Sequence, residues 1–288
     1  MNALLIQADA LRERMARPGC LVFDVRHDLA DHAAGRQAYE AGHIPGALYL
    51  APETQLSGAR SGRNGRHPLP DRGEFAALMR AQGLTARTEV VVYDGGNAMF
   101  AVRLWWMLRW LGHEAVTVLD GGWAAWLAAG GESEAGRRDP ALSEAQAIEG
   151  TVLSGKPSMP QVDACAVLAN LAEPRFTILD ARAADRFSGA AETIDPVGGH
   201  IPGALNRSFL DNIGPDGRFK APARLRAEFE TLLGDRLDRG VVHQCGSGIT
   251  ACHNLFAMEL AGLRGSALYP GSWSEWCSDP ARPVAQGA

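Results

Sequence analysis

The sequence predicts an α/β protein of two tandem domains, each a mainly parallel sheet flanked by helices. Its 288 residues are more than one ordinary hydrophobic core needs, and they suit two domains. In both halves, short apolar runs typical of buried strands alternate with longer runs of helical periodicity. This alternation favours parallel strands joined by helices that cover both faces of the sheet.

The expected elements follow the same order in each half. The strand-like runs are LVFDV at 21–25, VVVYD at 90–94 and AVTVLD at 115–120, then FTILDA at 176–181, GVVHQC at 240–245 and GSALYP at 265–270. The clearest helical runs are 100–112 and 251–263, and each follows a strand-like run.

An internal repeat explains this order. The first half carries FDVR at 23–26, GHIPGAL at 42–48, VVVYDGG at 90–96 and DGGWAAW at 120–126. The second half carries ILDAR at 178–182, GHIPGAL at 199–205, VVHQCGSG at 241–248 and PGSWSEW at 270–276. Four motifs in one order indicate a duplicated unit. The polar stretch between the halves predicts domains at 1–130 and 157–288, joined by a linker at 131–156.

Composition excludes several classes of function. The net charge is −5, which argues against nucleic acid or an anionic membrane as a partner, so an anionic substrate needs a local cluster of basic residues. The apolar stretch around residues 105–112 is interrupted by Arg109, and the N-terminus lacks the apolar run of a signal peptide. Five irregularly spaced cysteines form no disulfide framework. We therefore expect a cytoplasmic protein with reduced thiols.

Cys245 is the strongest candidate for chemistry. It follows a strand-like run and opens the loop CGSGIT, whose two glycines suit a tight turn before a predicted helix. Ligands bind at this edge of doubly wound sheets, and amides at a helix start stabilise an anion there. The loop predicts a reactive thiolate at Cys245, with the amides of Gly246, Ser247, Gly248, Ile249 and Thr250 around it.

Other interpretations of this loop fit less well. A cysteine after an apolar run is often a small core residue, but a core position would not need the flanking glycines. The pattern G-x-G-x-x-A matches a dinucleotide fingerprint in form, yet no acidic residue follows the next strand. A cysteine phosphatase would need an arginine where Ala251 stands, and no standard zinc spacing is present. Neither a metal nor an organic cofactor is expected.

The repeated motifs and the cysteine loop resemble the rhodanese superfamily in its tandem form, across nearly the whole chain. The resemblance implies two rhodanese-like domains, of which the first is non-catalytic because Asp94 stands where the second has Cys245. The loop CGSGIT is similar to the loop of 3-mercaptopyruvate sulfurtransferases, whereas thiosulfate sulfurtransferases carry basic residues after the cysteine. This implies a sulfurtransferase that forms a persulfide on Cys245.

The resemblance also implies site residues beyond the loop. Arg186 matches an arginine that holds the substrate carboxylate, Ser247 a serine that relays or hydrogen-bonds a proton, and His43 a histidine that faces the active cleft. One departure concerns a second arginine before the second GHIPGAL, where this chain has the segment 192–198 with no basic residue. Arg207, just after that motif, is the candidate replacement.

The expected reaction moves sulfur from a small-molecule donor, 3-mercaptopyruvate, to a thiol, a thioredoxin-like protein or cyanide. Two alternatives stay open. The donor can instead be thiosulfate with the same nucleophile, or the chain can be a catalytically silent rhodanese module that senses or binds a partner. Retention of the cysteine and its glycine loop favours the enzyme.

Overall fold

The structure, a computed structural model, describes residues 3–140 and 158–287. Its contacts divide the chain into two compact units. As far as these ranges are described, the N-terminal unit comprises Met1–Gly58, Leu69–Ser158 and Pro215–Arg218, and the C-terminal unit comprises Ala59–Pro68, Met159–Gly214 and Phe219–Ala288. Each unit thus includes a short segment from the other half of the sequence.

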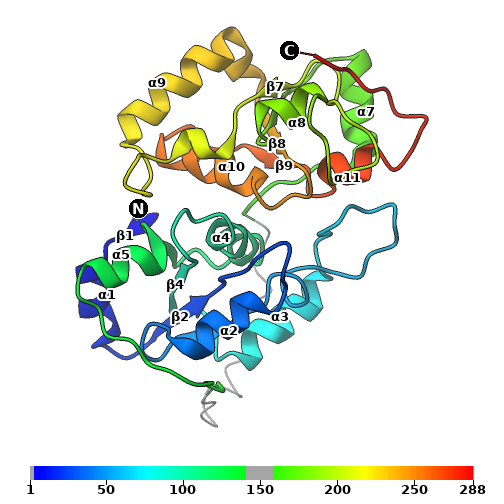
Figure 1. The fold of residues 1–288 in the computed structure, drawn as a ribbon. Helices are drawn as coiled ribbons and strands as arrows, with labels where there is room; N and C mark the ends of the chain where they lie inside the picture. Colours follow the sequence, from blue (N-terminus) through cyan, green and yellow to red (C-terminus); the bar gives the residue numbers. More distant parts are fainter. Residues whose placement is uncertain (1–2, 141–157, 288) are drawn as a thin grey trace. The chain divides into compact units, whose positions relative to one another are not determined.

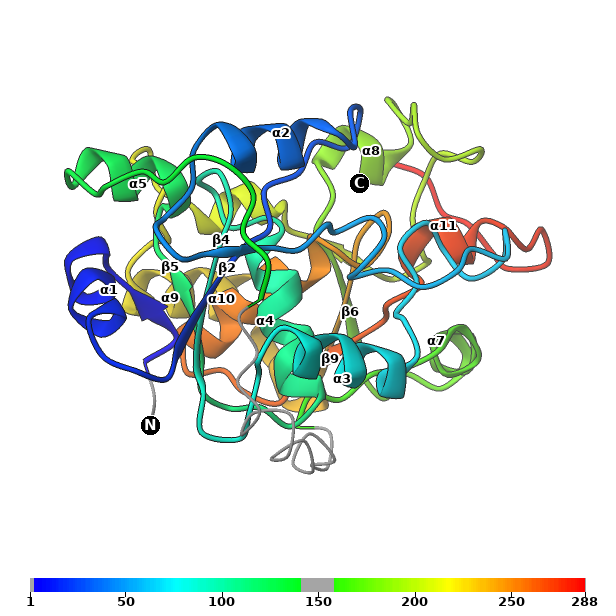
Figure 2. The same ribbon diagram turned by 90° about the horizontal axis from the view of Figure 1, so that it is seen from below.

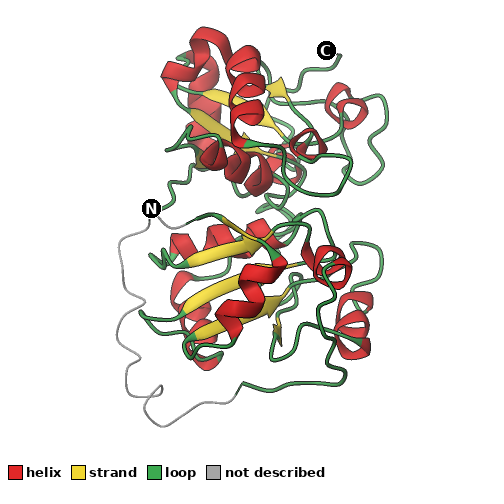
Figure 3. Cartoon of the chain, turned by 90° about the vertical axis from the view of Figure 1, so that its left-hand side faces the viewer, coloured by secondary structure: helices red, strands yellow, loops and turns green. Residues whose placement is uncertain are grey.

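The N-terminal unit is built on a fully parallel five-stranded sheet with the order β1-β5-β4-β2-β3. The strands are β1 Leu5–Ile6, β2 Cys20–Asp24, β3 Leu48–Tyr49, β4 Glu89–Tyr93 and β5 Val116–Leu119. The helices are α1 Ala8–Met15, α2 Ala34–Ala41, α3 Arg72–Ala81, α4 Ala101–Trp110 and α5 Gly122–Ala128 (Figure 1). Helices lie on both sides of the strands (Figure 3).

The C-terminal unit repeats this plan with a parallel four-stranded sheet of order β7-β6-β8-β9. The strands are β6 Thr177–Asp180, β7 Leu205–Asn206, β8 Val241–Gln244 and β9 Ala267–Leu268. The helices are α7 Ala164–Ala172, α8 Ala184–Ser188, α9 Pro222–Leu233, α10 Ala251–Leu260 and α11 Ser272–Trp276, with 3-10 turns η1 Phe209–Asn212 and η2 Gly234–Arg239.

Alternate residues of the C-terminal strands enter two different cores. Ile178 and Val242 pack in one cluster with Trp273, whereas Leu179 and Val241 pack in a second cluster with Phe229. Because successive side chains of a strand point to opposite faces, both faces of the sheet are buried, which accounts for the continuous apolar runs in the sequence. The predicted two-domain α/β fold with parallel sheets is confirmed.

The predicted linker at 131–156 is only partly described. Residues 141–156 lie outside the described ranges. Glu134 pairs with His43 in an isolated antiparallel bridge, with both backbone N···O distances at 2.9 Å. Residues around Glu134 therefore belong to the N-terminal unit rather than to a free connection.

The repeated D-x-R motif ties the end of a strand to the GHIPG turn in both units. In the C-terminal unit, Arg182 Nη2 donates to Asp180 at 2.7 Å and to the carbonyl of Gly199 at 2.8 Å. In the N-terminal unit, Arg26 Nη2 donates to Asp24 at 2.7 Å and to the carbonyl of Gly42 at 2.6 Å. These side chains are buried, so each charge is matched by its partner.

The segment Ala59–Pro68 is the part of the first half that belongs to the C-terminal unit. It runs beside α11 (Figure 2), where the backbone N–H of Arg66 donates to Ser274 Oγ at 3.0 Å. Within the described part of the chain, no helix combines the length and the apolar character that a bilayer crossing requires.

Candidate active site

Cys245 directly follows β8 and lies six residues before the start of α10, as the sequence predicts. Its side chain is buried, with 2% exposure, but it is not in an apolar environment. The Sγ atom accepts hydrogen bonds from the backbone N–H groups of Gly248 at 3.1 Å and Ser247 at 3.4 Å. Amide donors aimed at sulfur stabilise a thiolate and any anion that replaces it.

The loop glycines are required by close approach of other groups. Gly248 has φ +83°, and a Cβ there would lie 2.3 Å from the carbonyl oxygen of Pro270. A Cβ at Gly246 would lie 2.9 Å from Arg66 Nη2 and 3.5 Å from Arg186 Nη1. Thus Gly248 gives the loop its path, and Gly246 leaves room for two guanidinium groups beside the cysteine.

The start of α11 holds the cysteine loop through backbone contacts. Ser272 Oγ accepts from the backbone N–H of Cys245 at 3.1 Å, and the N–H of Trp273 donates to the carbonyl of Cys245 at 2.9 Å. The N–H of Ser274 donates to the carbonyl of Gly246 at 3.0 Å. The repeated G-x-W motif therefore supplies backbone contacts to the loop in addition to buried tryptophans.

His67 is a site residue that the sequence did not reveal. Its Nδ1 lies 2.7 Å from Ser247 Oγ, and the residue is 5% exposed. Ser247 thus contributes its N–H to the cysteine sulfur and its hydroxyl to a histidine. A serine–histidine pair beside a sulfur nucleophile can hold or move a proton during transfer.

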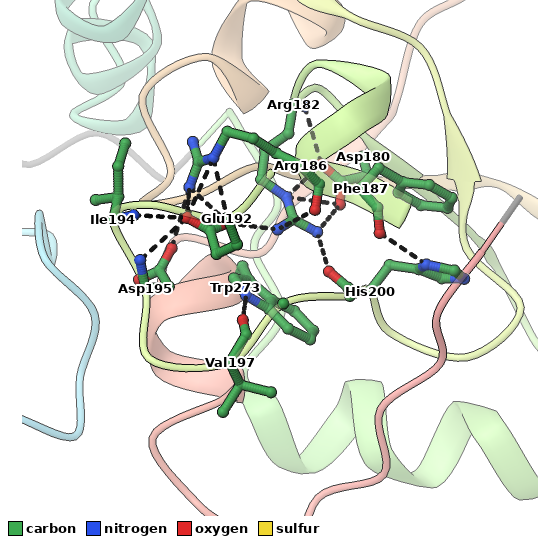
Figure 4. A network of polar contacts seen from close by, with 12 residues as sticks. Asp180, Arg182, Arg186, Phe187, Glu192, Ile194, Asp195, Val197, His200 and Trp273 are labelled. Carbon is green, nitrogen blue, oxygen red and sulfur yellow. Dashed lines mark hydrogen bonds and ion pairs between the residues drawn. The ribbon is translucent and has the colours of Figure 1, made fainter. Parts of the chain in front are cut away.

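Arg186 lies at the site but is not free to bind a substrate in this structure. Its guanidinium makes two contacts of 2.9 Å from Nη2 to Glu192, and Nη2 also contacts Asp195 at 3.2 Å (Figure 4). Asp195 in turn forms an ion pair with Arg66. The segment 192–198 therefore places two carboxylates on Arg186. In the sequence alone, this segment is distinguished only by its lack of a basic residue.

Arg207 is engaged elsewhere in the C-terminal unit. Its Nη2 pairs with Glu228 at 2.7 Å, its Nε donates to Asn212 at 3.0 Å, and its guanidinium lies 4.4 Å from the ring centre of Phe229. These contacts anchor α9. The prediction that Arg207 binds substrate stays a prediction, and its surroundings favour a structural role.

The two motif histidines have matching surroundings. His43 stacks on Tyr39 with ring centres 3.9 Å apart, and His200 stacks on Phe187 at 3.8 Å. In each, Nδ1 bonds the carbonyl of the residue on which the ring stacks. Both units share this histidine geometry, but only the C-terminal unit has a cysteine after its central strand. The geometry therefore favours a structural role for His43 as well as for His200.

The last loop residues lead into the helix. Ile249 is 4% exposed and its carbonyl accepts from the N–H of Cys252 at 3.1 Å, while Thr250 stands immediately before α10 without a side-chain cap bond. The amides that bond Cys245 Sγ are instead those of Ser247 and Gly248, in the glycine-rich part of the loop.

The N-terminal unit has a carboxylate where the C-terminal unit has sulfur. Asp94 Oδ1 accepts from the N–H groups of Gly96 and Ala98, both at 3.0 Å, and Oδ2 accepts from those of Phe100 at 2.9 Å and Ala101 at 3.3 Å. The same loop geometry therefore binds a built-in anion. A carboxylate cannot form a persulfide, so Asp94 cannot serve as a sulfur carrier.

Within the described ranges, one group of side chains has the composition of a metal site. The ligand atoms of His27, His32 and Glu53 in the N-terminal unit all lie within 4.8 Å of one another. None of them belongs to the cysteine loop.

Fold and loop together define a class: a tandem α/β protein whose second repeat presents a cysteine at the end of a parallel strand. The rhodanese-like domain family matches residues 7–129 and 163–279, and the chain belongs to this family. The resemblance inferred from the motifs is thereby confirmed.

Relatives that match over nearly their full length are sulfurtransferases. The chain is 46% identical over 294 residues to the probable 3-mercaptopyruvate sulfurtransferase of Pseudomonas aeruginosa, a match that covers 99% of each chain. It is 34% identical to the thiosulfate sulfurtransferase of Bos taurus, over 97% of this chain and 93% of that one. The protein is accordingly an enzyme of the sulfurtransferase class.

Solved structures agree. The 3-mercaptopyruvate sulfotransferase SseA from Escherichia coli matches with a TM-score of 0.77 and 31% identity, over 94% of this chain and 99% of that one. The 3-mercaptopyruvate sulfurtransferase from Leishmania major matches with a TM-score of 0.80 and 30% identity, over 95% of this chain and 74% of that one.

Proposed function

We propose that the protein transfers sulfur from 3-mercaptopyruvate to a thiophilic acceptor through a persulfide on Cys245. The observation that carries this proposal is the pair of amide hydrogen bonds to Cys245 Sγ, from Gly248 at 3.1 Å and Ser247 at 3.4 Å. They favour the thiolate before the reaction and the anionic persulfide after it. The relatives named for this donor at 46% and 34% identity support it.

In the first half-reaction the Cys245 thiolate attacks the sulfur of 3-mercaptopyruvate. A sulfur–sulfur bond forms and the carbon–sulfur bond of the donor breaks. The electron pair of that bond goes to carbon and gives the enolate of pyruvate. The transferred sulfur first keeps its proton as Cys245–S–SH, and loss of this proton gives the anionic persulfide that the loop amides hold. Protonation of the enolate completes pyruvate, and this step needs a proton source at the site.

Ser247 is the proposed proton donor, with His67 as its partner. Ser247 Oγ and His67 Nδ1 lie 2.7 Å apart. The hydroxyl can therefore give its proton to the enolate while the histidine replaces that proton or stabilises the alkoxide left behind. Because Ser247 also donates its N–H to the sulfur, its hydroxyl is fixed close to the carbon–sulfur bond that breaks.

In the second half-reaction an acceptor thiolate attacks the outer sulfur of the persulfide. A new persulfide forms on the acceptor, and Cys245 leaves as the thiolate that started the cycle. The acceptor thiolate belongs to a small thiol or a thioredoxin-like protein. Cyanide is the other acceptor: its carbon attacks the outer sulfur, thiocyanate leaves, and Cys245 is again released as the thiolate. The protein is proposed to act in the cytoplasm. Two separate half-reactions predict ping-pong kinetics, so a sequential pattern would contradict the mechanism.

Intact-mass measurement tests the covalent step. After incubation with 3-mercaptopyruvate, the protein should gain about 32 Da, the mass of one sulfur atom held as a persulfide. Cys245→Ser should lose this adduct, whereas Cys165→Ser, which removes an exposed thiol, should retain it. An adduct that survives Cys245→Ser would overturn the proposal, and no adduct from any donor would favour a silent rhodanese module.

Thiosulfate is the alternative donor, because relatives of comparable coverage carry that name. A comparison of kcat/KM for the two donors on the purified protein decides between them. We expect 3-mercaptopyruvate to be preferred, since the loop after Cys245 carries no basic residue of its own.

A further inference from the structure

Two arginines from distant parts of the sequence share one carboxylate beside the cysteine loop. Arg66 Nη1 contacts Asp195 Oδ1, and Arg186 Nη2 contacts Asp195 Oδ2 at 3.2 Å. Both guanidinium groups also lie against Gly246, the residue after Cys245. Two guanidiniums that each hold a different oxygen of one carboxylate form a bidentate carboxylate site next to the sulfur.

The carboxylate in this site comes from a surface loop. Asp195 turns its side chain inward, with 3% exposure, whereas its neighbours Ile194 and Val197 are 54% and 36% exposed. The loop is tied down after Asp195 by the indole N–H of Trp273, which donates to the carbonyl of Val197 at 2.9 Å (Figure 4). No regular secondary structure holds Asp195 itself in place.

Glu192 of the same loop is held far more firmly. Its carboxylate accepts from Arg186, from Arg182 and from the backbone N–H groups of Ile194 and Asp195. Burial opposes its charge, but these hydrogen bonds outweigh burial and lower the pKa of Glu192.

Asp195 differs from Glu192 in this respect. Burial raises the pKa of the Asp195 carboxyl, although Arg66 acts to lower it, so its ionised form is the less well stabilised of the two. Of the two carboxylates on Arg186, Asp195 is therefore the easier one to displace.

We propose that Asp195 is a built-in occupant of the donor's carboxylate site, and that the carboxylate of the sulfur donor displaces it to bind between Arg66 and Arg186. This rests on the proposed sulfurtransferase function and names the class of donor, an α-keto acid or another carboxylate. Arg66 then supplies the second cation that the segment 192–198 lacks. Asp195 sets the affinity for the donor, because donor and side chain compete for the same two arginines.

The competition can be measured with one variant. Asp195→Asn removes the charge and keeps the size of the side chain. We expect the KM for 3-mercaptopyruvate to fall about tenfold, with kcat nearly unchanged. A change of this size corresponds to a wild type in which Asp195 occupies the carboxylate site in about nine molecules of ten. Asp185→Asn is the matched control. It also removes one negative charge near Arg186, but Asp185 is exposed and its carboxylate accepts the backbone N–H of Arg186. The KM of this variant should equal that of the wild type.

A second variant keeps the proposal testable if Asp195→Asn folds poorly. Arg66→Met should raise the KM for 3-mercaptopyruvate at least about tenfold, because it removes one of two charge-assisted contacts to the carboxylate. The rate with mercaptoacetone, the same mercaptoketone without a carboxylate, should not change. A circular dichroism melt of each variant separates loss of fold from loss of binding.

The outcomes distinguish this inference from the proposed function. If the wild type forms no persulfide from any donor, the function itself fails. If persulfide forms but Asp195→Asn leaves or raises the KM, or if Arg66→Met affects both mercaptoketones equally, the function stands and the displacement of Asp195 is overturned.

Discussion

His67 Nδ1 and Ser247 Oγ lie 2.7 Å apart although 180 residues separate them in the sequence. The contact exists because Ala59–Pro68 belongs to the C-terminal unit. Ser247 is thereby held between a histidine on one side and the sulfur of Cys245 on the other. His67 positions the hydroxyl, and the sulfur accepts from the backbone N–H of Ser247, an arrangement that suits the proton donor proposed for this reaction.

Removal of either partner should slow proton delivery. Ser247→Ala and His67→Gln are each expected to lower kcat for 3-mercaptopyruvate about 100-fold, the usual contribution of one acid–base group. Because the two act as one unit, the double variant should be no slower than the worse single variant. Steady-state rates measure this. Effects that multiply in the double variant would show that the residues act separately.

Gly248→Ala should impair both folding and persulfide formation. A left-handed φ of +83° and a Cβ at 2.3 Å from the carbonyl of Pro270 both oppose the change, and together they should cost about 2–5 kcal/mol of unfolding free energy. The N–H that bonds Cys245 Sγ would shift as well. Urea unfolding and intact mass after donor incubation are the measurements.

Gly265→Ala is the matched control for that change. Gly265 has a similar φ of +90°, but a Cβ at this position would meet nothing within 4 Å, so only backbone strain of about 1–2 kcal/mol applies. Equal losses in the two variants would mean that the approach of Pro270 is unimportant.

Glu228→Gln should destabilise the protein in a pH-dependent way. Burial opposes the charge of Glu228, but hydrogen bonds from three basic side chains outweigh it and lower its pKa to about 2; these are Arg207, Arg224 and Lys220. A folded-state pKa below the unfolded value means that the charge stabilises the fold above about pH 4.5 and that this stability is lost as the pH falls toward about 2.

At neutral pH we expect Glu228→Gln to lower the unfolding free energy by about 1–2 kcal/mol, after allowance for partial solvent exposure. The difference from the wild type should close near pH 2, as followed by urea unfolding at several pH values. Glu230→Gln, on an exposed pair with Arg226, should change little at any pH. A loss that is constant with pH would contradict the electrostatic origin.

Asp94→Ala should weaken the N-terminal unit without removing the nucleophile. It leaves four backbone N–H groups without their acceptor, at a cost of about 3 kcal/mol or more in unfolding free energy. Protein that remains folded should still gain one sulfur on Cys245. A stability equal to that of the wild type would show that water replaces the carboxylate at these amides.

Much of the molecule could be predicted from the sequence because its signals are local. The strands β2, β4, β5, β6, β8 and β9 follow from continuous apolar runs, whereas the two-residue strands β1, β3 and β7 were not predicted. The cysteine loop follows from a strand end, two glycines and a helix start. The amide donors at Cys245 were expected along the whole loop, but those at the sulfur come from Ser247 and Gly248. Which amides turn inward depends on the path of the loop past Pro270, which no local pattern encodes.

Arg66, His67 and Asp195 were missed because their roles depend on contacts across the sequence. One signal was present: Arg60, Arg63 and Arg66 form a basic cluster in an otherwise acidic chain. Its place in the first half associated it with the non-catalytic repeat. Spacing within a repeat cannot show that a loop of the first half contacts α11, the cysteine loop and Asp195 in the second.

Residues 59–68 belong to the C-terminal unit and residues 215–218 to the N-terminal unit. This exchange limits where the duplicated chain can be cut into separate domains. A cut at the apparent midpoint would yield a C-terminal fragment that keeps the thiol but loses the histidine beside Ser247 and the arginine beside Asp195. To keep both residues beside the cysteine loop, such a fragment would have to be joined to residues 59–68.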